Sequence, residues 1–263
     1  MVFFTWSWLM SEAREGAKLI EVLHLAFLQA LPSHLPLADY VVKGGANLRL
    51  FEQSARRSGD IDLDYAGRSD RFDIVEDKVD AALRSASFRN LLALAGVRMS
   101  EPTKPKQTDT TRRWEFSVEG TGAFLNSKIE FSNRGTDPEY DFATARDDIG
   151  RGLGLRVVRA NRYLPPAAIR QKIRALGQRS EIEPRDVFDL DLLLARHPSA
   201  VQPGEVPARE LEAALNAAFA IDYDAYRELV VEFLEDDQVD IYGRPEVWSD
   251  MVLKVAAALE ALR

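Results

Sequence analysis

The chain has no cysteine and only three histidines among its 263 residues. The absence of cysteine excludes disulfides, thiolate zinc sites and cysteine nucleophiles, and three histidines leave little room for imidazole chemistry. No stretch reaches the roughly 18 apolar residues that cross a membrane, and the N-terminus lacks the basic region and cleavage site of a signal peptide. We therefore expect a cytoplasmic protein whose chemistry runs on carboxylates, Lys and Arg.

The chain also lacks an excess of positive charge. Its 34 basic side chains are outnumbered by 42 acidic ones, and the formal charge of −8 excludes a cationic surface that binds nucleic acid without specificity. The charge is uneven, because residues 151–185 carry nine basic and two acidic side chains, net +7, whereas residues 1–150 are net −4. Such a belt would attract phosphates if it lay on one face. Arginines scattered over a solvated helix account for the count equally well.

The pattern of apolar residues divides the chain in two. A spacing of 3.6 residues predicts helices and strict alternation predicts strands. In the first part we expect helices over residues 12–31, 46–56 and 73–94, strands over 40–42, 60–65 and 155–158, and a hairpin of 113–118 and 125–131. Afterwards we expect only helices, over 166–178, 185–196, 206–219, 222–236 and 245–262. The sequence predicts an α/β domain over residues 1–160 and an all-helical domain over 161–263.

An alternating acidic segment is the most informative feature. On a strand, Asp60, Asp62 and Asp64 point to one face and the apolar residues between them to the other. Three neighbouring carboxylates repel one another unless water or a divalent cation compensates them, so metal binding is the first hypothesis. An edge strand with a solvated acidic face is the alternative. A calcium-binding EF-hand loop is excluded, because its positions six and twelve are Tyr65 and Arg71 here.

Two glycines precede this segment by a short helix. Gly44 and Gly45 follow Lys43 at the end of a predicted strand, and a helix is expected from Ala46. A Gly-Gly turn lets backbone amides approach a phosphate, and the start of a helix adds free N–H groups and a positive dipole end. Strand, Gly-Gly, helix and acidic strand together predict a site for a triphosphate and a metal.

A third acid would complete a site for two metal ions. Alternation over residues 128–132 places Lys128, Glu130 and Ser132 on one face of a later strand. We predict Glu130 as the third metal ligand. A carboxylate that merely faces solvent on a strand is the alternative.

The helical part carries two further candidates. Lys172 lies on the edge of the apolar stripe of its predicted helix, where an ammonium either reaches water or meets an anion. Asp186 and Asp189 lie one turn apart at the start of the next helix, where the helix dipole favours carboxylates with no function required. An ion pair of Asp186 with Lys172 would make the two helices one unit.

These motifs, in this order, resemble the AbiEii/AbiGii toxin family, which includes the MenT toxins, within the DNA polymerase β-like nucleotidyltransferase superfamily. The resemblance covers roughly residues 40–195 and implies a mixed sheet with helices followed by a helical C-terminal lobe. It rests on Lys-Gly-Gly-Ala-Asn-Leu-Arg-Leu from residue 43, Ser-Gly-Asp-Ile-Asp-Leu from 58, Lys-Ile-Glu-Phe-Ser from 128, Lys-Ile-Arg-Ala-Leu from 172 and Arg-Asp-Val-Phe-Asp-Leu from 185.

The resemblance also implies an activity: transfer of a nucleoside monophosphate from an NTP, with Mg²⁺ or Mn²⁺, to RNA, the 3′ end of tRNA being the leading acceptor. The implied partner is an AbiEi-like antitoxin of a type IV toxin–antitoxin pair. The implied metal ligands are Asp60, Asp62 and Glu130; the nucleotide-binding residues are Lys43, Gly44, Gly45, Lys172 and Arg185; the catalytic residues are Asp60, Asp62, Glu130, Lys172 and Asp186, with Asp189 as a structural partner.

Two alternatives to RNA modification stay open. The same chemistry could modify a protein or a small molecule. A nucleotide-binding module without transfer activity is the other alternative, and one departure from the family pattern favours it. The family commonly has Gly-Gly-Thr where this chain has Ala46 after the glycines. The change removes a hydroxyl that could bind a phosphate oxygen and leaves the backbone amides in place.

Overall fold

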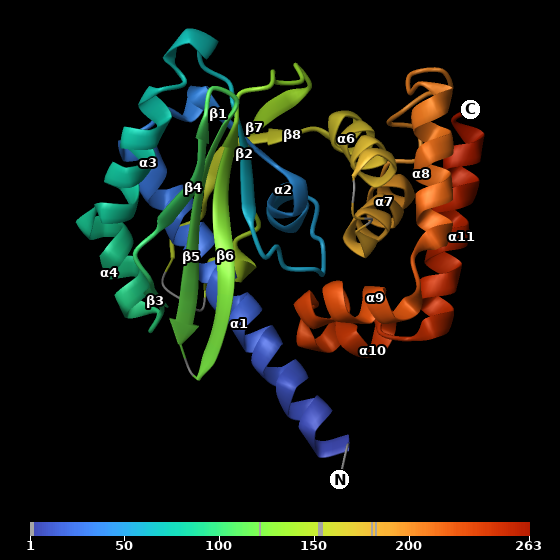
Figure 1. The fold of residues 1–263 in the computed structure, drawn as a ribbon, viewed down its shortest axis with the longest axis horizontal. Helices are drawn as coiled ribbons and strands as arrows, with labels where there is room; N and C mark the ends of the chain where they lie inside the picture. The colour runs from blue at the N-terminus through green and yellow to red at the C-terminus, as the bar shows by residue number, and fades with distance from the viewer. Residues whose placement is uncertain (1–2, 121, 152–154, 180, 182) are drawn as a thin grey trace. The chain divides into compact units, whose positions relative to one another are not determined.

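The chain folds into two compact units in a computed structural model (Figure 1). The structure describes the backbone of residues 3–120, 122–151, 155–179, 181 and 183–263, and the side chains in these ranges from residue 13 onward. The first unit consists of residues 1–53 and 57–163, and the second of residues 54–56 and 164–263. A short piece of the N-terminal half therefore belongs to the helical unit.

The first unit is built on a mixed sheet of eight strands. Their order is β3-β5-β6-β2-β1-β8-β7, with β4 paired to β5. The pairs β1–β8 and β2–β6 are parallel and the other pairs are antiparallel. The strands are β1 (Tyr40–Lys43), β2 (Ile61–Tyr65), β3 (Arg98–Met99), β4 (Thr103–Thr108), β5 (Thr111–Gly120), β6 (Ala123–Ser132), β7 (Tyr140–Thr144) and β8 (Arg159–Tyr163). The expected α/β class is confirmed.

Helices cover this sheet. The core forms where α1 packs on β5 and β6, with Leu23 and Phe27 of α1 fully buried four residues apart. Helices α3 and α4 lie on the same side as α1, and α2 lies on the other side (Figure 1). No helix in the described ranges is long and apolar enough to cross a membrane. The helices are α1 (Phe3–Ala30), α2 (Gly44–Phe51), α3 (Ile74–Arg84), α4 (Ala86–Leu94) and α5 (Asp148–Arg151).

Three predictions for this unit are wrong in detail. The helix expected over 73–94 is broken at Ser85, whose extended backbone and hydroxyl, which accepts from the Phe88 N–H at 3.2 Å, cap a new helix. The helix expected to reach Arg56 ends at Phe51, and Gln53 follows with a positive φ of 55°. Residues 155–158 form no strand, because β8 begins only at Arg159.

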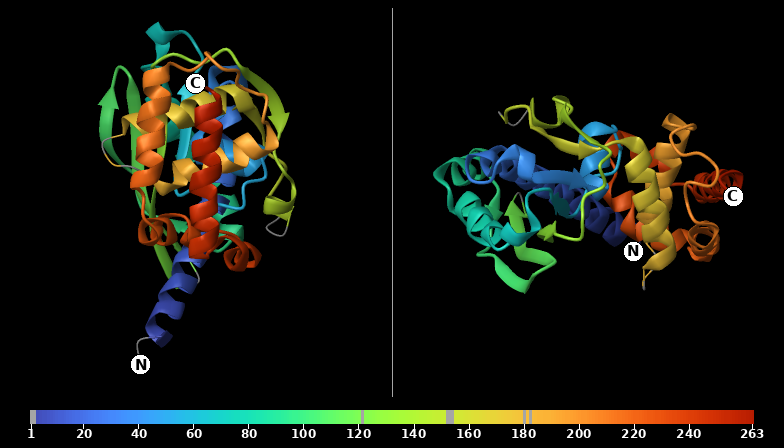
Figure 2. Two further views of the ribbon diagram at one scale, coloured as in Figure 1. Left: turned by 90° about the vertical axis from the view of Figure 1, so that its right-hand side faces the viewer. Right: turned by 90° about the horizontal axis from the view of Figure 1, so that it is seen from above.

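The second unit is helical, as expected. Helices α8 and α11 run side by side (Figure 2), and α6 approaches α8 so closely that a Cβ on Gly177 would lie 2.9 Å from the Ala214 nitrogen. The helix expected over 222–236 ends at Leu229, and short 3₁₀ turns at Val231–Phe233 and Asp236–Gln238 replace its second half. The helices are α6 (Pro165–Gln178), α7 (Pro184–Arg196), α8 (Ala208–Ala220), α9 (Tyr223–Leu229), α10 (Val239–Tyr242) and α11 (Pro245–Ala261).

Carboxylates compensate much of the positive charge in the basic belt of residues 151–185. The belt is divided between the two units, and most of its side chains pair with carboxylates. Arg162 binds Glu52 at 2.7 Å, and Arg185 lies 3.4 Å from Glu183. Similar pairs join Arg151 to Asp147, Arg170 to Glu205 and Arg174 to Glu210. The structure favours the interpretation as scattered, neutralised arginines.

Buried His24 makes stability depend on pH. Burial lowers the pKa of this side chain from 6.5 to about 4, although the Asp60 carboxylate opposes the shift. Between these values the unfolded chain binds a proton that the folded protein does not, so the free energy of unfolding falls as the pH drops. The loss is on the order of 3 kcal/mol at pH 4. Urea unfolding of wild type and His24→Gln from pH 7 to 4 tests this effect. We expect the free energy of unfolding of His24→Gln to fall less steeply as the pH drops; an equally steep fall in both proteins would contradict the effect.

Candidate active site

Four polar side chains lie opposite one another on four neighbouring strands. The register pairs Lys43 of β1 with Asp62 of β2, Asp62 with Glu130 of β6, and Glu130 with Arg113 of β5. We call these four residues the polar row. Because paired positions share a face of the sheet, two carboxylates lie side by side with a cation on each flank. The expected proximity of Asp62 and Glu130 is therefore present.

Ion pairs hold most carboxylates of this face. Arg113 binds Glu130 through two nitrogens: Nη2 lies 2.6 Å and Nε 2.8 Å from the same carboxylate oxygen. Lys128, which sequence reasoning placed on this face without a role, binds Asp60 at 2.7 Å. All four side chains are between 16% and 31% exposed, so they remain accessible to a ligand.

Asp62 is the exception. Its carboxylate makes no hydrogen bond or ion pair with any residue that the structure describes. Burial raises its pKa, the Lys43 ammonium opposes the shift, and the Asp60 and Glu130 carboxylates add to it. A carboxylate that is desolvated between two others has an unfavourable charge in the protein alone. A cation bound at this point would relieve it.

Gly44 brings the start of α2 against Asp62. Its φ of +63° suits glycine, and a Cβ at this position would lie 3.4 Å from Asp62 Oδ2. No side chain caps the helix at Lys43, so the N–H groups of its first turn have no intrahelical partner. These amides are the donors that the sequence predicted for a phosphate. Ala46 is buried here, so its missing hydroxyl leaves these donors in place.

Asp64 has a structural role in the described protein. Lys43 Nζ donates to Asp64 Oδ1, and the Tyr163 hydroxyl donates to Asp64 Oδ2, both at 2.6 Å. Burial and the Asp64 charge raise the pKa of Tyr163, so the phenol stays protonated as a donor. The acidic segment therefore separates into Asp64, which orients Lys43, and Asp60 and Asp62, which stay candidates for metal binding.

The carboxylates suit a divalent cation in their chemistry. Carboxylate oxygens are the ligands that Mg²⁺ and Mn²⁺ prefer, and Asp60, Asp62 and Glu130 share one face of two neighbouring strands. Among the residues described, no three acidic or histidine side chains converge closely enough to hold a metal ion. Lys128 and Arg113 hold Asp60 and Glu130 instead, so a cation would have to compete with these two side chains.

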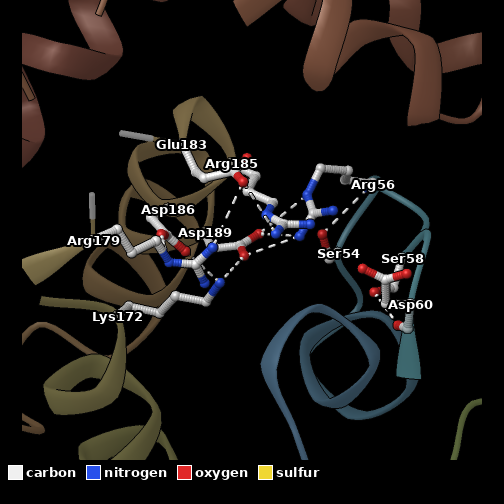
Figure 3. Close-up of polar contacts among 10 residues, drawn as sticks. All are labelled: Ser54, Arg56, Ser58, Asp60, Lys172, Arg179, Glu183, Arg185, Asp186 and Asp189. Carbon is white, nitrogen blue, oxygen red and sulfur yellow. Dashed lines mark hydrogen bonds and ion pairs between the residues drawn. The ribbon is translucent and has the colours of Figure 1, made fainter. Parts of the chain in front are cut away.

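In the second unit, Lys172, Asp186, Asp189 and Arg56 form a buried network (Figure 3). Lys172 Nζ lies 2.8 Å from Asp186 and 2.5 Å from Asp189, so the expected pair of Lys172 with Asp186 is present. Arg56 Nη2 lies 3.0 and 3.1 Å from the two oxygens of Asp189. Both aspartates are completely buried. Burial alone would raise the pKa of Asp189, but Arg56 and Lys172 lower it.

This burial bears on the predicted roles. Asp186 is inaccessible to a substrate, so any effect on catalysis would pass through Lys172 or Arg179, whose Nε lies 3.3 Å away. Arg185 is partly exposed and lies beside Glu183. Direct roles for Lys172 and Arg185, and an indirect role for Asp186, stay predictions. Arg56 was missed, because its partner lies 133 residues away in the chain.

Comparison with known proteins identifies the family. The family described as "Nucleotidyl transferase AbiEii toxin, Type IV TA system" matches residues 26–261. No curated protein matches. The fold is similar to the crystal structure of JHP933 from Helicobacter pylori (TM-score 0.55, 16% identity, 94% of this chain and 91% of that one). It is also similar to a second H. pylori structure described as a nucleotidyltransferase (TM-score 0.53, 17% identity, 90% and 95%). The chain belongs to the AbiEii family of nucleotidyltransferase toxins of type IV toxin–antitoxin systems.

Proposed function

We propose that this nucleotidyltransferase uses Mg²⁺ or Mn²⁺ to transfer a nucleoside monophosphate from an NTP to RNA, at the 3′ end of tRNA. The observation that carries the proposal is the position of Asp62. This carboxylate, which has no partner in the described part of the chain, lies opposite Glu130 and against Gly44 at the open start of α2. Acidic oxygens and free amides thus meet at one point, as a metal-bound triphosphate requires.

The β1 side of the polar row would bind the triphosphate. Amides of Gly44 and Gly45 donate to phosphate oxygens, and the Lys43 ammonium, 24% exposed and oriented by Asp64, adds a positive charge. Asp60, Asp62 and Glu130 would hold the divalent cation, which supplies charge neutralisation at phosphorus. In this proposal the phosphates lie on the β1 flank of Asp62.

The transfer exchanges one bond at the α-phosphorus for another. The acceptor hydroxyl oxygen forms a bond to this phosphorus, the bond to the β-phosphate oxygen breaks, and pyrophosphate leaves with the electron pair. Glu130 is proposed to accept the hydroxyl proton when it is not held by Arg113. The rate gain comes from positioning and charge compensation, because such displacements need little covalent help.

Labelled substrates test this proposal. Purified protein is incubated with each α-³²P NTP and total tRNA, with Mg²⁺, Mn²⁺ or EDTA. We expect label in RNA with either metal and none with EDTA. Periodate oxidation of the tRNA destroys the 3′-terminal diol and should abolish labelling, whereas removal of the 5′ phosphate should not.

Three other results would change or overturn this proposal. Label in the protein or in a small molecule would replace RNA as the acceptor. Labelling that survives periodate would place the modification away from the 3′ end. NTP binding without any transfer would overturn the proposed reaction.

The family also implies a cognate antitoxin, and we propose an AbiEi-like protein as this partner; its co-expression should relieve the growth arrest that the wild-type toxin causes.

A further inference from the structure

A polar cavity of about 370 Å³ opens beside Asp60 and Lys128 in the first unit. Its walls come from β5, β6 and the segment that joins β3 to β4. Asp60 and Lys128 belong both to this cavity and to the face that carries the polar row, so the two are continuous. The other lining side chains used below are Ser100, Glu101, Glu115, Ser117 and Asn126.

We infer that this cavity binds the terminal nucleoside of the acceptor, a step that rests on the proposed transfer to RNA. In an in-line displacement the attacking and leaving oxygens lie on opposite sides of the phosphorus. The amides of Gly44 and the Lys43 ammonium place the phosphates on the β1 flank of Asp62. The sheet order β5-β6-β2-β1 places the cavity on the opposite flank. The acceptor hydroxyl must come from that side.

The charge of the cavity selects a nucleoside over a phosphate. The lining contains three carboxylates, Asp60, Glu101 and Glu115, and one ammonium, Lys128, which is already paired with Asp60. Phosphate oxygens would be repelled there. An uncharged group that offers hydroxyl and amine donors is attracted instead. The volume lies within the usual range for small-molecule sites, about 300–1,000 Å³.

Two side chains give the cavity a preference among bases. Ser117 Oγ donates to Asn126 Oδ1 at 3.1 Å, and Ser100 Oγ accepts from the Ser117 N–H at 3.0 Å. The hydrogen bond from Ser117 Oγ fixes the orientation of the Asn126 amide, whose NH₂ group donates to no residue in the described ranges. The Glu115 carboxylate, which forms a long ion pair of 3.6 Å with Arg113 and is 45% exposed, is a second side chain that can bind a ligand, as an acceptor. An amide donor beside a carboxylate acceptor matches a ring nitrogen next to an exocyclic amine, as in adenosine or cytidine.

Short RNAs that differ only in the last base test the inference. We expect wild-type protein to prefer a terminal adenosine over inosine, and cytidine over uridine, because each pair differs by the amine. Asn126→Ala should raise the acceptor KM about tenfold, the loss expected for one hydrogen bond, and should erase this preference. Glu115→Gln keeps an amide oxygen that can accept from the amine but loses the negative charge, so it should raise the acceptor KM and weaken the preference. The KM for NTP should not change. Glu119→Gln is the matched control, since Glu119 lies on the same strand outside the cavity and pairs with Arg98.

The outcomes separate the inference from the proposed function. RNA labelling by wild type with no larger effect of Glu115→Gln than of Glu119→Gln would overturn the cavity assignment alone. A rise in the KM for NTP would assign the cavity to the nucleotide and also overturn it. Absence of RNA labelling by folded wild type would overturn the proposed function. Fluorescence anisotropy of the same RNAs then decides the cavity separately, because equal binding by wild type and both variants would reject it.

Discussion

Asp62→Asn should abolish nucleotidyl transfer and stabilise the protein in metal-free buffer. The activity should fall by about 10³-fold, the scale found when a charge-stabilising group is removed from a reaction centre. The stability should rise because Asp62 is desolvated between Asp60 and Glu130 and has no pairing partner among the described residues. The side-chain amide of this variant is uncharged and has almost the same shape as the carboxylate, so it removes the repulsion without changing the packing.

Transfer assays and urea unfolding in EDTA measure the two effects. The pKa of Asp62 is raised in the folded protein, so its ionisation destabilises the fold, and the advantage of Asp62→Asn should grow as the pH rises through the folded pKa. Asp77→Asn, on the exposed surface of α3, should change neither quantity. Loss of activity together with loss of stability would mean that Asp62 is structural. Retained activity would remove it from the mechanism.

Asp189→Ala should destabilise the protein by about 3–5 kcal/mol, the usual cost of leaving buried charges without their partner. The change removes the Asp189 carboxylate from Arg56, which is 3% exposed, and one of the two carboxylates that bind Lys172. Urea unfolding of the full chain gives this number. Glu260→Gln, which breaks the exposed pair with Arg263, is the control and should cost less than about 1 kcal/mol.

A double replacement separates the charge effect from packing. Arg56→Met with Asp189→Leu removes both charges and keeps apolar volume, and should recover much of the stability lost in Asp189→Ala. A double variant as unstable as the single one would show that packing around Asp189, and not the ion pair, supports the fold. Near-wild-type stability of Asp189→Ala would contradict a structural role for this network.

Local patterns predicted those features of the candidate site that short-range geometry decides, and the functional roles of its residues stay predictions. Alternation fixed the common face of Asp60 and Asp62, and Gly44 with Gly45 marked the start of α2, which begins two residues before the predicted Ala46. Glu130 was predicted to act together with Asp62 from the alternation of its own strand. The parallel pairing of β2 with β6 gives the physical reason why the two residues lie side by side. Function at the family level followed from the order of these motifs.

Partners that are distant in the chain could not be predicted in this way. The pairing of Arg113 with Glu130 was within reach, because the pair of Gly120 with Ala123 fixes the register of the whole hairpin. Arg56 with Asp189 was not, since no local pattern relates them. Strands β3, β4 and β7 were missed because they are short or polar edge segments, and Pro105 in β4 argues locally against a strand.

The division of the second unit into two pieces of chain affects how the protein is made. Ser54–Arg56 leaves the ribosome well before helix α7, and the 133 residues between Arg56 and Asp189 take on the order of ten seconds to synthesise. During this interval the guanidinium that will be buried has no aspartate to bind. Ser54–Arg56, which lies just before the Asp60 motif, therefore gains this buried partner only after helix α7 has been synthesised. A fragment that begins at Leu164 would lack this segment, so separate expression of the helical unit should yield an incompletely folded product.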